Sequence, residues 1–97
     1  MLVRVEIIAN RSVEEDLLEQ FSLQSIDYRT VISPVHGVGE CGPCLGDNIW
    51  PEENSYILLF VDEKTADIIG EIVTTIREQH RGTGLSCFIS RSGVTEL

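Results

Sequence analysis

The sequence predicts an α+β fold in which two helices cover one face of a four-stranded antiparallel sheet. Four segments rich in Val, Ile and Leu predict strands, and two segments with apolar residues at helical spacing predict helices. Their order along the chain, β-α-β-β-α-β, is that of the ferredoxin-like arrangement. Because 97 residues with 42% hydrophobic content suffice for one core, we expect residues 1–97 to form a single domain.

The first strand and the first helix are expected at the start of the chain. Residues 2–9 are rich in Val and Ile, with charged residues on the opposite face, as in a half-buried strand. Ser12 is expected to cap the helix, because Glu15 lies three positions later and completes a capping box. Leu17 and Phe21 recur on one helical face, which predicts the side that packs against the sheet.

The second and third strands differ in character. Residues 28–35 alternate, and Pro34 near their end cannot donate to a ladder, so an edge strand is expected. Residues 55–61 are apolar without alternation, which predicts a central strand with both faces covered.

The last helix and strand complete the predicted sheet. Asp62 is expected to cap a helix that extends to about His80, and Gly82 provides its C-terminal stop. Residues 85–90 predict the fourth strand, and residues 91–97 form a polar tail.

This arrangement places the first and third strands in the middle of the sheet and both helices on one face. The other face would remain open in a single chain. Because the third strand is apolar throughout, we expect an oligomer to cover that face.

The charge of the chain excludes several classes of partner. Sixteen acidic residues face only 7 basic ones, which gives a net charge of -9. Nucleic acids and anionic membranes need clustered Lys and Arg, so neither is expected as a partner. The N-terminal segment lacks the apolar run of a signal peptide, and no segment approaches the roughly 20 apolar residues of a membrane span. We therefore expect a cytoplasmic protein without membrane insertion.

Residues 37–54 predict a long loop held out by the rest of the domain. The segment contains four glycines, two prolines, two of the three cysteines and the single tryptophan. Loops of this length in small domains are usually functional or disordered. We therefore expect the site of function in this loop.

The spacing of Cys41 and Cys44 is shared by dithiol redox sites and half zinc sites. Structural zinc takes four ligands, so His36 and Cys87 are the candidates to complete a Zn or Cu site. The same pair from a neighbouring subunit is an alternative. An ordinary strand-end residue is the simpler explanation of His36, and a cysteine on an apolar strand such as Cys87 is more often a small buried hydrophobe.

Thioredoxins share the sequence Cys-Gly-Pro-Cys but not its surroundings in this chain. A thioredoxin-type site opens a helix, which lowers the pKa of the thiol. The residues after Cys44, Leu-Gly-Asp-Asn-Ile-Trp-Pro, cannot begin a stable helix. Catalysis by a dithiol is therefore the weaker interpretation.

Several motifs resemble those of PII signalling proteins. Residues 35–39, Val-His-Gly-Val-Gly, resemble the Val-x-Gly-x-Gly that opens the T-loop of that family. Residues 66–77 resemble its second helix, and residues 81–84, Arg-Gly-Thr-Gly, resemble its B-loop with one extra glycine. Residues 87–89 lie where the family has Lys-Ile-Phe. The resemblance spans nearly the whole chain.

The resemblance implies a ferredoxin-like homotrimer that regulates other proteins and is not an enzyme. It implies that ATP or ADP binds in clefts between subunits, and that the loop engages a target protein such as a transporter or an enzyme. The residues that match the lining of this cleft are Gly37, Gly39, Thr83 and Gly84.

The chain departs from the family at positions that bind ligands. The phosphate-binding lysine of the family falls on Cys87, and Glu40 and Cys41 replace the polar pair associated with 2-oxoglutarate. The loop contains acidic residues and no Lys or Arg, so phosphates would meet negative charge.

Backbone amides offer another way to bind an anion. Glycine-rich turns at residues 37–39 and 82–84 would form amide nests, with Arg81 adding positive charge. Any binding of ATP is expected to be weak.

Three hypotheses about function follow. The first is a PII-like trimer whose loop senses a small ligand, a metal or a redox state and signals to a partner protein. The second is a small thiol-disulfide oxidoreductase that uses Cys41 and Cys44. The third is a metal-binding protein resembling the CutA-type trimers. Turnover of a disulfide substrate would distinguish the second hypothesis from the others.

Overall fold

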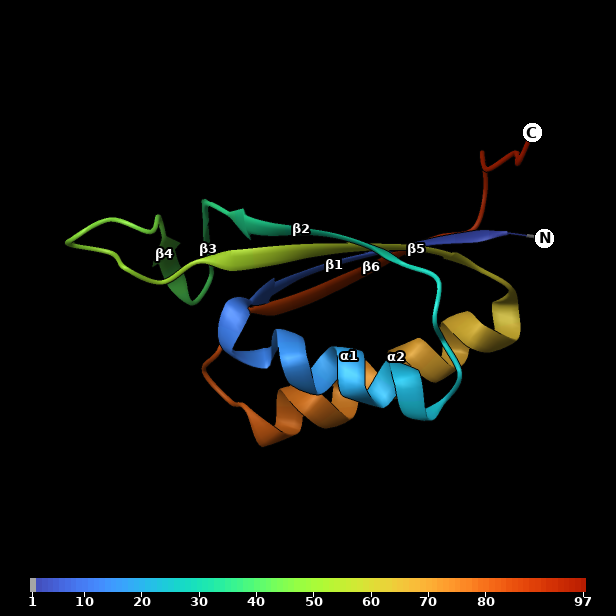
Figure 1. The fold of residues 1–97 in the computed structure, drawn as a ribbon, viewed down its shortest axis with the longest axis horizontal. Helices are drawn as coiled ribbons and strands as arrows, with labels where there is room; N and C mark the ends of the chain where they lie inside the picture. The colour runs from blue at the N-terminus through green and yellow to red at the C-terminus, as the bar shows by residue number, and fades with distance from the viewer. Residues whose placement is uncertain (1) are drawn as a thin grey trace.

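The computed structural model describes residues 2–97. In chain order its elements are β1 (Val3–Asn10), the 3-10 turn η1 (Arg11–Val13), α1 (Glu14–Leu23), β2 (Thr30–Val35), β3 (Gly37–Gly39), β4 (Gly42–Cys44), β5 (Asn54–Val61), α2 (Glu63–Gln79) and β6 (Leu85–Ser90). Figure 1 shows both helices on the same side of the sheet, with β3 and β4 beyond one end of it. The predicted α+β fold is confirmed.

The main sheet has the strand order β2-β5-β1-β6, and every neighbouring pair is antiparallel. The first and third predicted strands, β1 and β5, are therefore central, as expected. They pair along their whole length, from Val3 opposite Val61 to Asn10 opposite Asn54. The strand that contains Pro34 lies at the edge, because a proline cannot donate to a second ladder.

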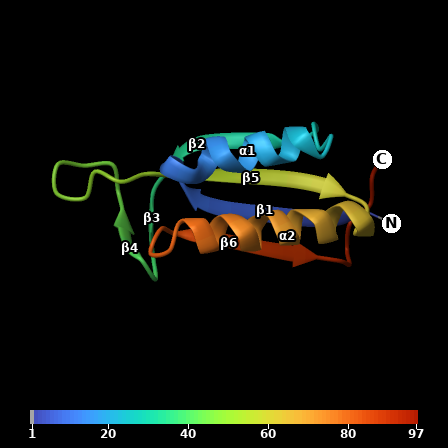
Figure 2. The same cartoon turned by 90° about the horizontal axis from the view of Figure 1, so that it is seen from below.

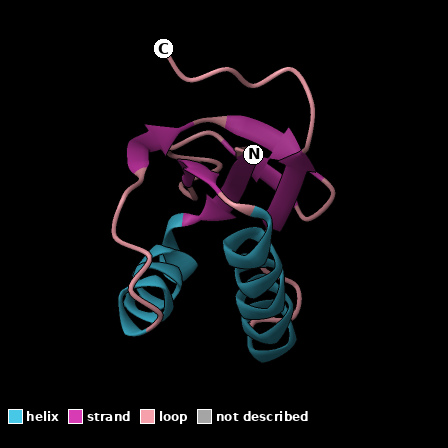
Figure 3. Ribbon diagram, turned by 90° about the vertical axis from the view of Figure 1, so that its right-hand side faces the viewer, coloured by secondary structure: helices cyan, strands magenta, loops and turns pink. Residues whose placement is uncertain are grey.

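The core lies between the sheet and the two helices. Figure 3 shows these two layers in a view along the helix axes. Alternate residues of β1 and β5 face the helices, and each helix turns one apolar stripe toward them. The residues that form the centre of this core are Val5, Ile7, Ile57 and Leu59 of the strands, Leu17 and Phe21 of α1, and Ile69, Val73 and Ile76 of α2.

The second face of the sheet has no covering element within this chain. Ile57 and Leu59 of β5 are buried beneath the helices, whereas Tyr56 and Leu58 are half-buried and Phe60 is exposed. One chain alone therefore covers only one face of β5, and its other face is open, as expected for a single chain. The open face is the surface for which an oligomer was expected.

The start of the first helix differs from the prediction. Asn10, not Ser12, makes the capping contact: its Oδ1 accepts a hydrogen bond from Ser12 N at 3.0 Å. This Asx-type contact stabilises the turn η1, and α1 begins at Glu14 without a side-chain cap. The capping box with Glu15 is therefore wrong, because a local turn competes for the same backbone donors.

The second helix and the last strand agree with the sequence. Asp62 Oδ1 accepts from Thr65 N at 2.8 Å, which confirms the predicted cap of α2. The helix ends at His80 as its C-cap, and β6 has the predicted bounds. In the described part of the chain, no helix is both long enough and apolar enough to cross a membrane.

The predicted long loop contains a short hairpin. Strands β3 and β4 pair from Gly37 opposite Cys44 to Gly39 opposite Gly42, with a two-residue turn at Glu40 and Cys41. Gly42 has a φ of +113°, which suits glycine in a tight hairpin. The first part of the segment predicted as a loop therefore forms two very short strands.

Candidate functional site

A cleft of about 680 Å³ opens where the hairpin approaches the start of β6. One wall is the hairpin from Gly39 to Cys44, and the other is the stretch from Gly82 to Phe88. Figure 2 shows the hairpin beyond the same end of the sheet at which α2 connects to β6. The fold thus brings together the two segments that the sequence singled out, although about 40 residues separate them along the chain.

The connection between α2 and β6 is held by backbone hydrogen bonds. Thr83 N donates to His80 O at 3.1 Å, and Asn10 N donates to Gly84 O at 2.8 Å. Gly82 has a φ of +83°, a conformation that glycine adopts without strain. This wall of the cleft is consequently fixed to both α2 and β1. The amide of Thr83 is occupied, so the expected amide nest at residues 82–84 is incomplete.

All three cysteines line the cleft as free thiols. Cys41 is exposed in the hairpin turn, whereas Cys44 and Cys87 are half-buried. Burial raises the pKa of the Cys87 thiol above its ordinary value, and the nearby Arg77 guanidinium opposes this rise to a smaller extent. Cys87 is therefore a poor nucleophile at neutral pH, because the thiolate is the reactive form.

The four candidate metal ligands do not come together within one chain. His36 points to Glu53, with its Nε2 2.9 Å from Glu53 Oε2, and does not line the cleft. No group of three or more His, Cys, Asp or Glu side chains in residues 2–97 is arranged to hold a metal ion. One chain therefore does not bring Cys41, Cys44, His36 and Cys87 together as a metal site, and a role of the cysteine pair in redox chemistry or metal binding stays a prediction.

Glu53 is a residue whose structural role the sequence did not reveal. Its carboxylate pairs with His36 at 2.9 Å and with Arg11 Nη1 at 3.1 Å. These contacts, His36 first and Arg11 next, hold the pKa of Glu53 below its ordinary value. The neighbouring Glu52 accepts from Asn10 Nδ2 at 2.9 Å. The end of the loop is therefore fixed to η1 and to the end of β2.

Some of the residues expected to contact a nucleotide line the cleft, and others lie outside it. Gly39, Thr83 and Gly84 line the cleft, whereas Gly37 and Arg81 do not. The extended backbone of residues 37–39 pairs with β4, so it does not form the concave nest that was expected there.

The arginine that lines the cleft is not Arg81, the one expected there. Arg81 forms an exposed ion pair with Glu78. Arg77 lines the cleft instead. The sequence signal was its position in the last turn of α2, next to the loop that carries Thr83.

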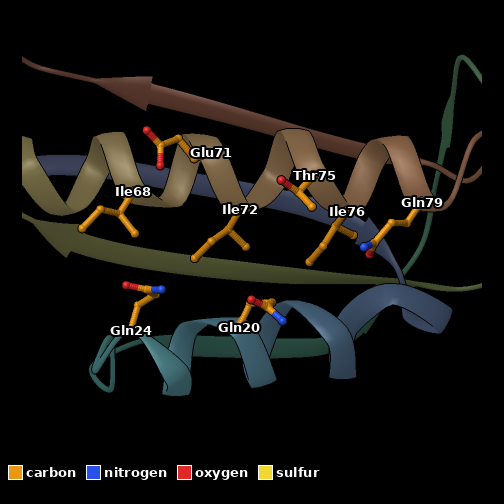
Figure 4. A pocket seen from close by; sticks show the side chains of 8 residues that line it. All are labelled: Gln20, Gln24, Ile68, Glu71, Ile72, Thr75, Ile76 and Gln79. Atoms are coloured by element: carbon orange, nitrogen blue, oxygen red, sulfur yellow. The ribbon is translucent and has the colours of Figure 1, made fainter.

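A second, smaller groove of about 280 Å³ lies between the two helices. Figure 4 shows amide side chains of α1 and α2 around an isoleucine floor. The lining consists of Gln20, Gln24, Ile68, Glu71, Ile72, Thr75, Ile76 and Gln79. It contains neither a cysteine nor an arginine, so the candidate chemistry belongs to the cleft at the hairpin.

Comparison with known proteins identifies the fold. No family model matches the chain, and no curated protein does. Among solved structures, CPII, a nitrogen regulatory PII-like protein from Thiomonas intermedia K12 bound to ADP, AMP and bicarbonate, superposes with a TM-score of 0.71. It is 18% identical, and the match covers 96% of this chain and 89% of that one. This chain has the PII-like fold.

Two other solved structures share the fold. A PII-like signalling protein from Thermus thermophilus matches with a TM-score of 0.67 and 19% identity, over 92% of this chain and 84% of that one. A DUF3240 family protein from Shewanella baltica matches with a TM-score of 0.63 and 10% identity, over 98% and 97% of the two chains. At these identities the likeness concerns the path of the backbone and leaves the roles of individual side chains open.

Proposed function

We propose that this chain is a PII-like regulatory protein that binds a small ligand in the cleft and signals its state to a partner protein. The observation that supports the proposal is the cleft itself, which joins the hairpin of the long loop to the α2–β6 connection. A ligand that contacts both walls would stabilise one position of the hairpin. Binding in the cleft is thereby linked to the shape of the surface that a partner would meet.

An adenine nucleotide is the proposed ligand. The structurally similar CPII is a complex with ADP, AMP and bicarbonate. In this chain Gly39, Thr83 and Gly84 line the cleft, which is large enough for a cofactor-sized molecule. Glu40 and Arg77 are the charged side chains of its lining, so the cleft has little net charge for a polyphosphate. We therefore propose that ADP or AMP is favoured and that ATP binds weakly.

The proposed partner surface is the outer part of the loop. Ile49 and Trp50 are exposed there, although large apolar side chains are usually buried. Asp47 Oδ1 accepts hydrogen bonds from the backbone N of both residues, at 3.0 and 2.6 Å. The loop thus presents a tryptophan in a fixed turn, which is typical of an interface anchor. A target protein such as a transporter or an enzyme would dock here.

Two cysteines of the cleft are the proposed sensing element for redox state or metal. Cys41 and Cys44 lie on the hairpin, and any shift between thiol, disulfide and metal-bound forms would change its shape. A complete metal site would need ligands from another subunit, since the described chain has no cluster of three. Turnover of a disulfide substrate would instead favour the oxidoreductase hypothesis, and we expect none because no helix begins at Cys44.

Calorimetry with ADP, AMP and ATP tests the proposed ligand. We expect ADP and AMP to bind to the purified chain, and Gly84→Val to abolish their binding. A Cβ at Gly84 meets no atom within 4 Å, so a valine can be placed at this lining position without a steric clash at its Cβ, and we expect it to compete with the ligand for space. Gly70→Ala is the matched control, because Gly70 also has open space but lies on α2 outside the cleft.

The outcomes of this experiment separate the parts of the proposal. Tight, magnesium-dependent binding of ATP would show that the charge argument is wrong. Absence of binding by every adenine nucleotide would contradict the proposed ligand. Equal loss of binding in both glycine variants would mean that the cleft is not the site.

A further inference from the structure

Arg77 differs from most arginines of this chain in what its side chain contacts. Four arginines form ion pairs with carboxylates, namely Arg4, Arg11, Arg81 and Arg91. Within residues 2–97, Arg77 has no such carboxylate partner. Its one side-chain hydrogen bond runs from Nη2 to Leu85 O at 3.1 Å.

That single hydrogen bond orients the guanidinium and occupies only one of its N–H donors. A guanidinium carries five N–H donors in a fixed plane, so most of them remain available. The acceptor, Leu85 O, belongs to the first residue of β6, and both Arg77 and Leu85 line the cleft. The side chain is thus anchored to a strand of the sheet at one wall of the cleft.

Arg77 also supplies the single positive charge of the cleft. The other charged lining residue, Glu40, lies on the opposite wall at the tip of the hairpin. The Cys87 thiol beside Arg77 is neutral at ordinary pH, because burial disfavours its charged form. No carboxylate lines the wall formed by α2 and β6.

From this placement we propose that Arg77 binds the oxyanion group, phosphate or carboxylate, of the ligand that occupies the cleft. A planar guanidinium matches such a group and can bind it through two parallel hydrogen bonds. The inference rests on the proposed use of the cleft as a ligand site, and it assigns that ligand a charged end at the β6 wall. The hairpin, with Glu40, then contacts the uncharged end.

One test compares Arg77→Gln and Arg77→Lys with Arg29→Gln. Arg29 is a matched control, because its side chain also donates to a backbone carbonyl, Asp27 O, at 3.1 Å, and it lies outside the cleft. The probes are ADP, adenosine and inorganic phosphate, measured by calorimetry. We expect Arg77→Gln to weaken binding of ADP roughly tenfold or more, because a charge-assisted hydrogen bond is lost. The affinity for adenosine, which has no phosphate, should stay unchanged. Arg77→Lys should restore part of the affinity.

A second readout does not depend on nucleotides. Cys87 lies beside Arg77. The positive guanidinium should attract an anionic alkylating reagent to this thiol, whereas it should not affect an uncharged reagent. The ratio of alkylation of Cys87 by iodoacetate to that by iodoacetamide, measured by peptide mass spectrometry, should fall in Arg77→Gln and not in Arg29→Gln. Inorganic phosphate should protect Cys87 from iodoacetate in the unmodified protein.

The possible results are distinguishable. If the protein binds no nucleotide but shows the expected alkylation ratios, the proposed nucleotide is wrong while the anion site at Arg77 stands, and protection by phosphate identifies a free oxyanion as the ligand. If Arg77→Gln changes neither the affinity for ADP nor the alkylation ratio of Cys87, the inference is overturned.

Discussion

At the scale of single residues, Glu53 decides where the long loop lies. Its carboxylate joins His36 after β2 to Arg11 before α1. Its backbone O also accepts from Arg11 N at 2.9 Å. Gly46 packs against the same group: a Cβ there would come within 2.7 Å of both Glu53 Oε2 and His36 Nε2. The loop therefore closes around one carboxylate.

We predict that Glu53→Gln loosens the loop in a pH-dependent way. The pKa of Glu53 in the folded protein lies below its ordinary value of 4.5. The ionised carboxylate therefore stabilises the fold above that value, and the stabilisation is lost as the pH falls through the lower folded-state pKa. At neutral pH the variant should have a lower Tm than the unmodified protein, and the difference should shrink below pH 4.5 and disappear once the pH is below the folded-state pKa.

Thermal unfolding at several pH values measures this effect, with Glu19→Gln as the control. Glu19 is exposed on α1, away from the loop and from the contacts of Glu53. A difference in Tm between Glu53→Gln and the unmodified protein that is equal at neutral and acidic pH would contradict the prediction.

Such residues show why the site could be predicted only in part. Cys41, Cys44, Cys87, Thr83 and Gly84 do meet at one cleft, because the hairpin and the α2–β6 connection lie at one end of the sheet. The contacts of His36 and Arg11 with Glu53 span 17 and 42 residues, and no local pattern in the sequence encodes them.

At the scale of elements, the hairpin couples the cysteine pair to backbone pairing. Gly42–Cys44 is extended in β4 and rises at about 3.3 Å per residue. A disulfide requires Cα atoms no more than about 7 Å apart. We infer that joining Cys41 to Cys44 would draw β4 away from β3. The hydrogen-bonded pairing of β3 with β4 therefore opposes closure of this disulfide.

We predict that mild oxidation forms this disulfide and opens the hairpin. With oxidised glutathione, Cys41 and Cys44 would lose two protons and two electrons, and the reagent would be reduced to two thiols. Intact-protein mass spectrometry should show the loss of two hydrogens. Hydrogen exchange of the amides in residues 37–44 should become faster.

The cysteine variants provide the controls for that experiment. Cys41→Ser and Cys44→Ser should each prevent the mass loss, whereas Cys87→Ser should retain it. The prediction fails if the unmodified protein forms only mixed disulfides with glutathione, or if Cys87→Ser also blocks the internal bond.

The elements themselves were largely predictable, and the exceptions have physical reasons. Apolar periodicity identified α2 and β1, because it records which face is buried, and an unbroken apolar run identified β5. The start of α1 was misplaced because Asn10 forms a local turn. The hairpin was missed because three-residue strands of Gly, Val, Pro and Cys have no periodic signal.

At the scale of the whole molecule, the open face of the sheet exposes apolar side chains that no element of the described chain covers. Ile8, Ile32, Phe60 and Phe88 are large apolar residues that remain exposed on it. Polar groups beside them are paired within the chain, since Tyr56 donates to Glu6 Oε2 at 2.7 Å. A face with satisfied polar groups and exposed aromatic rings is suited to association with copies of the same chain.

We predict that the protein is a homotrimer held together through this face. Phe60→Glu should convert the trimer into folded monomers, because it adds a charge to a contact surface and leaves the core of each chain intact. Each chain carries a charge of -9, so added salt should strengthen the association by screening repulsion. Leu23→Glu is the control, because Leu23 is also exposed but lies at the end of α1 on the helical side.

Light scattering at micromolar concentration gives the mass of each variant, and circular dichroism shows whether it is folded. A stable monomer or dimer of the unmodified protein would contradict the trimer. If Leu23→Glu dissociates the assembly and Phe60→Glu does not, the subunits associate through the helices, and the open face needs another partner. If Phe60→Glu dissociates the trimer and also abolishes ADP binding, the cleft between hairpin and β6 requires a neighbouring subunit for its completion.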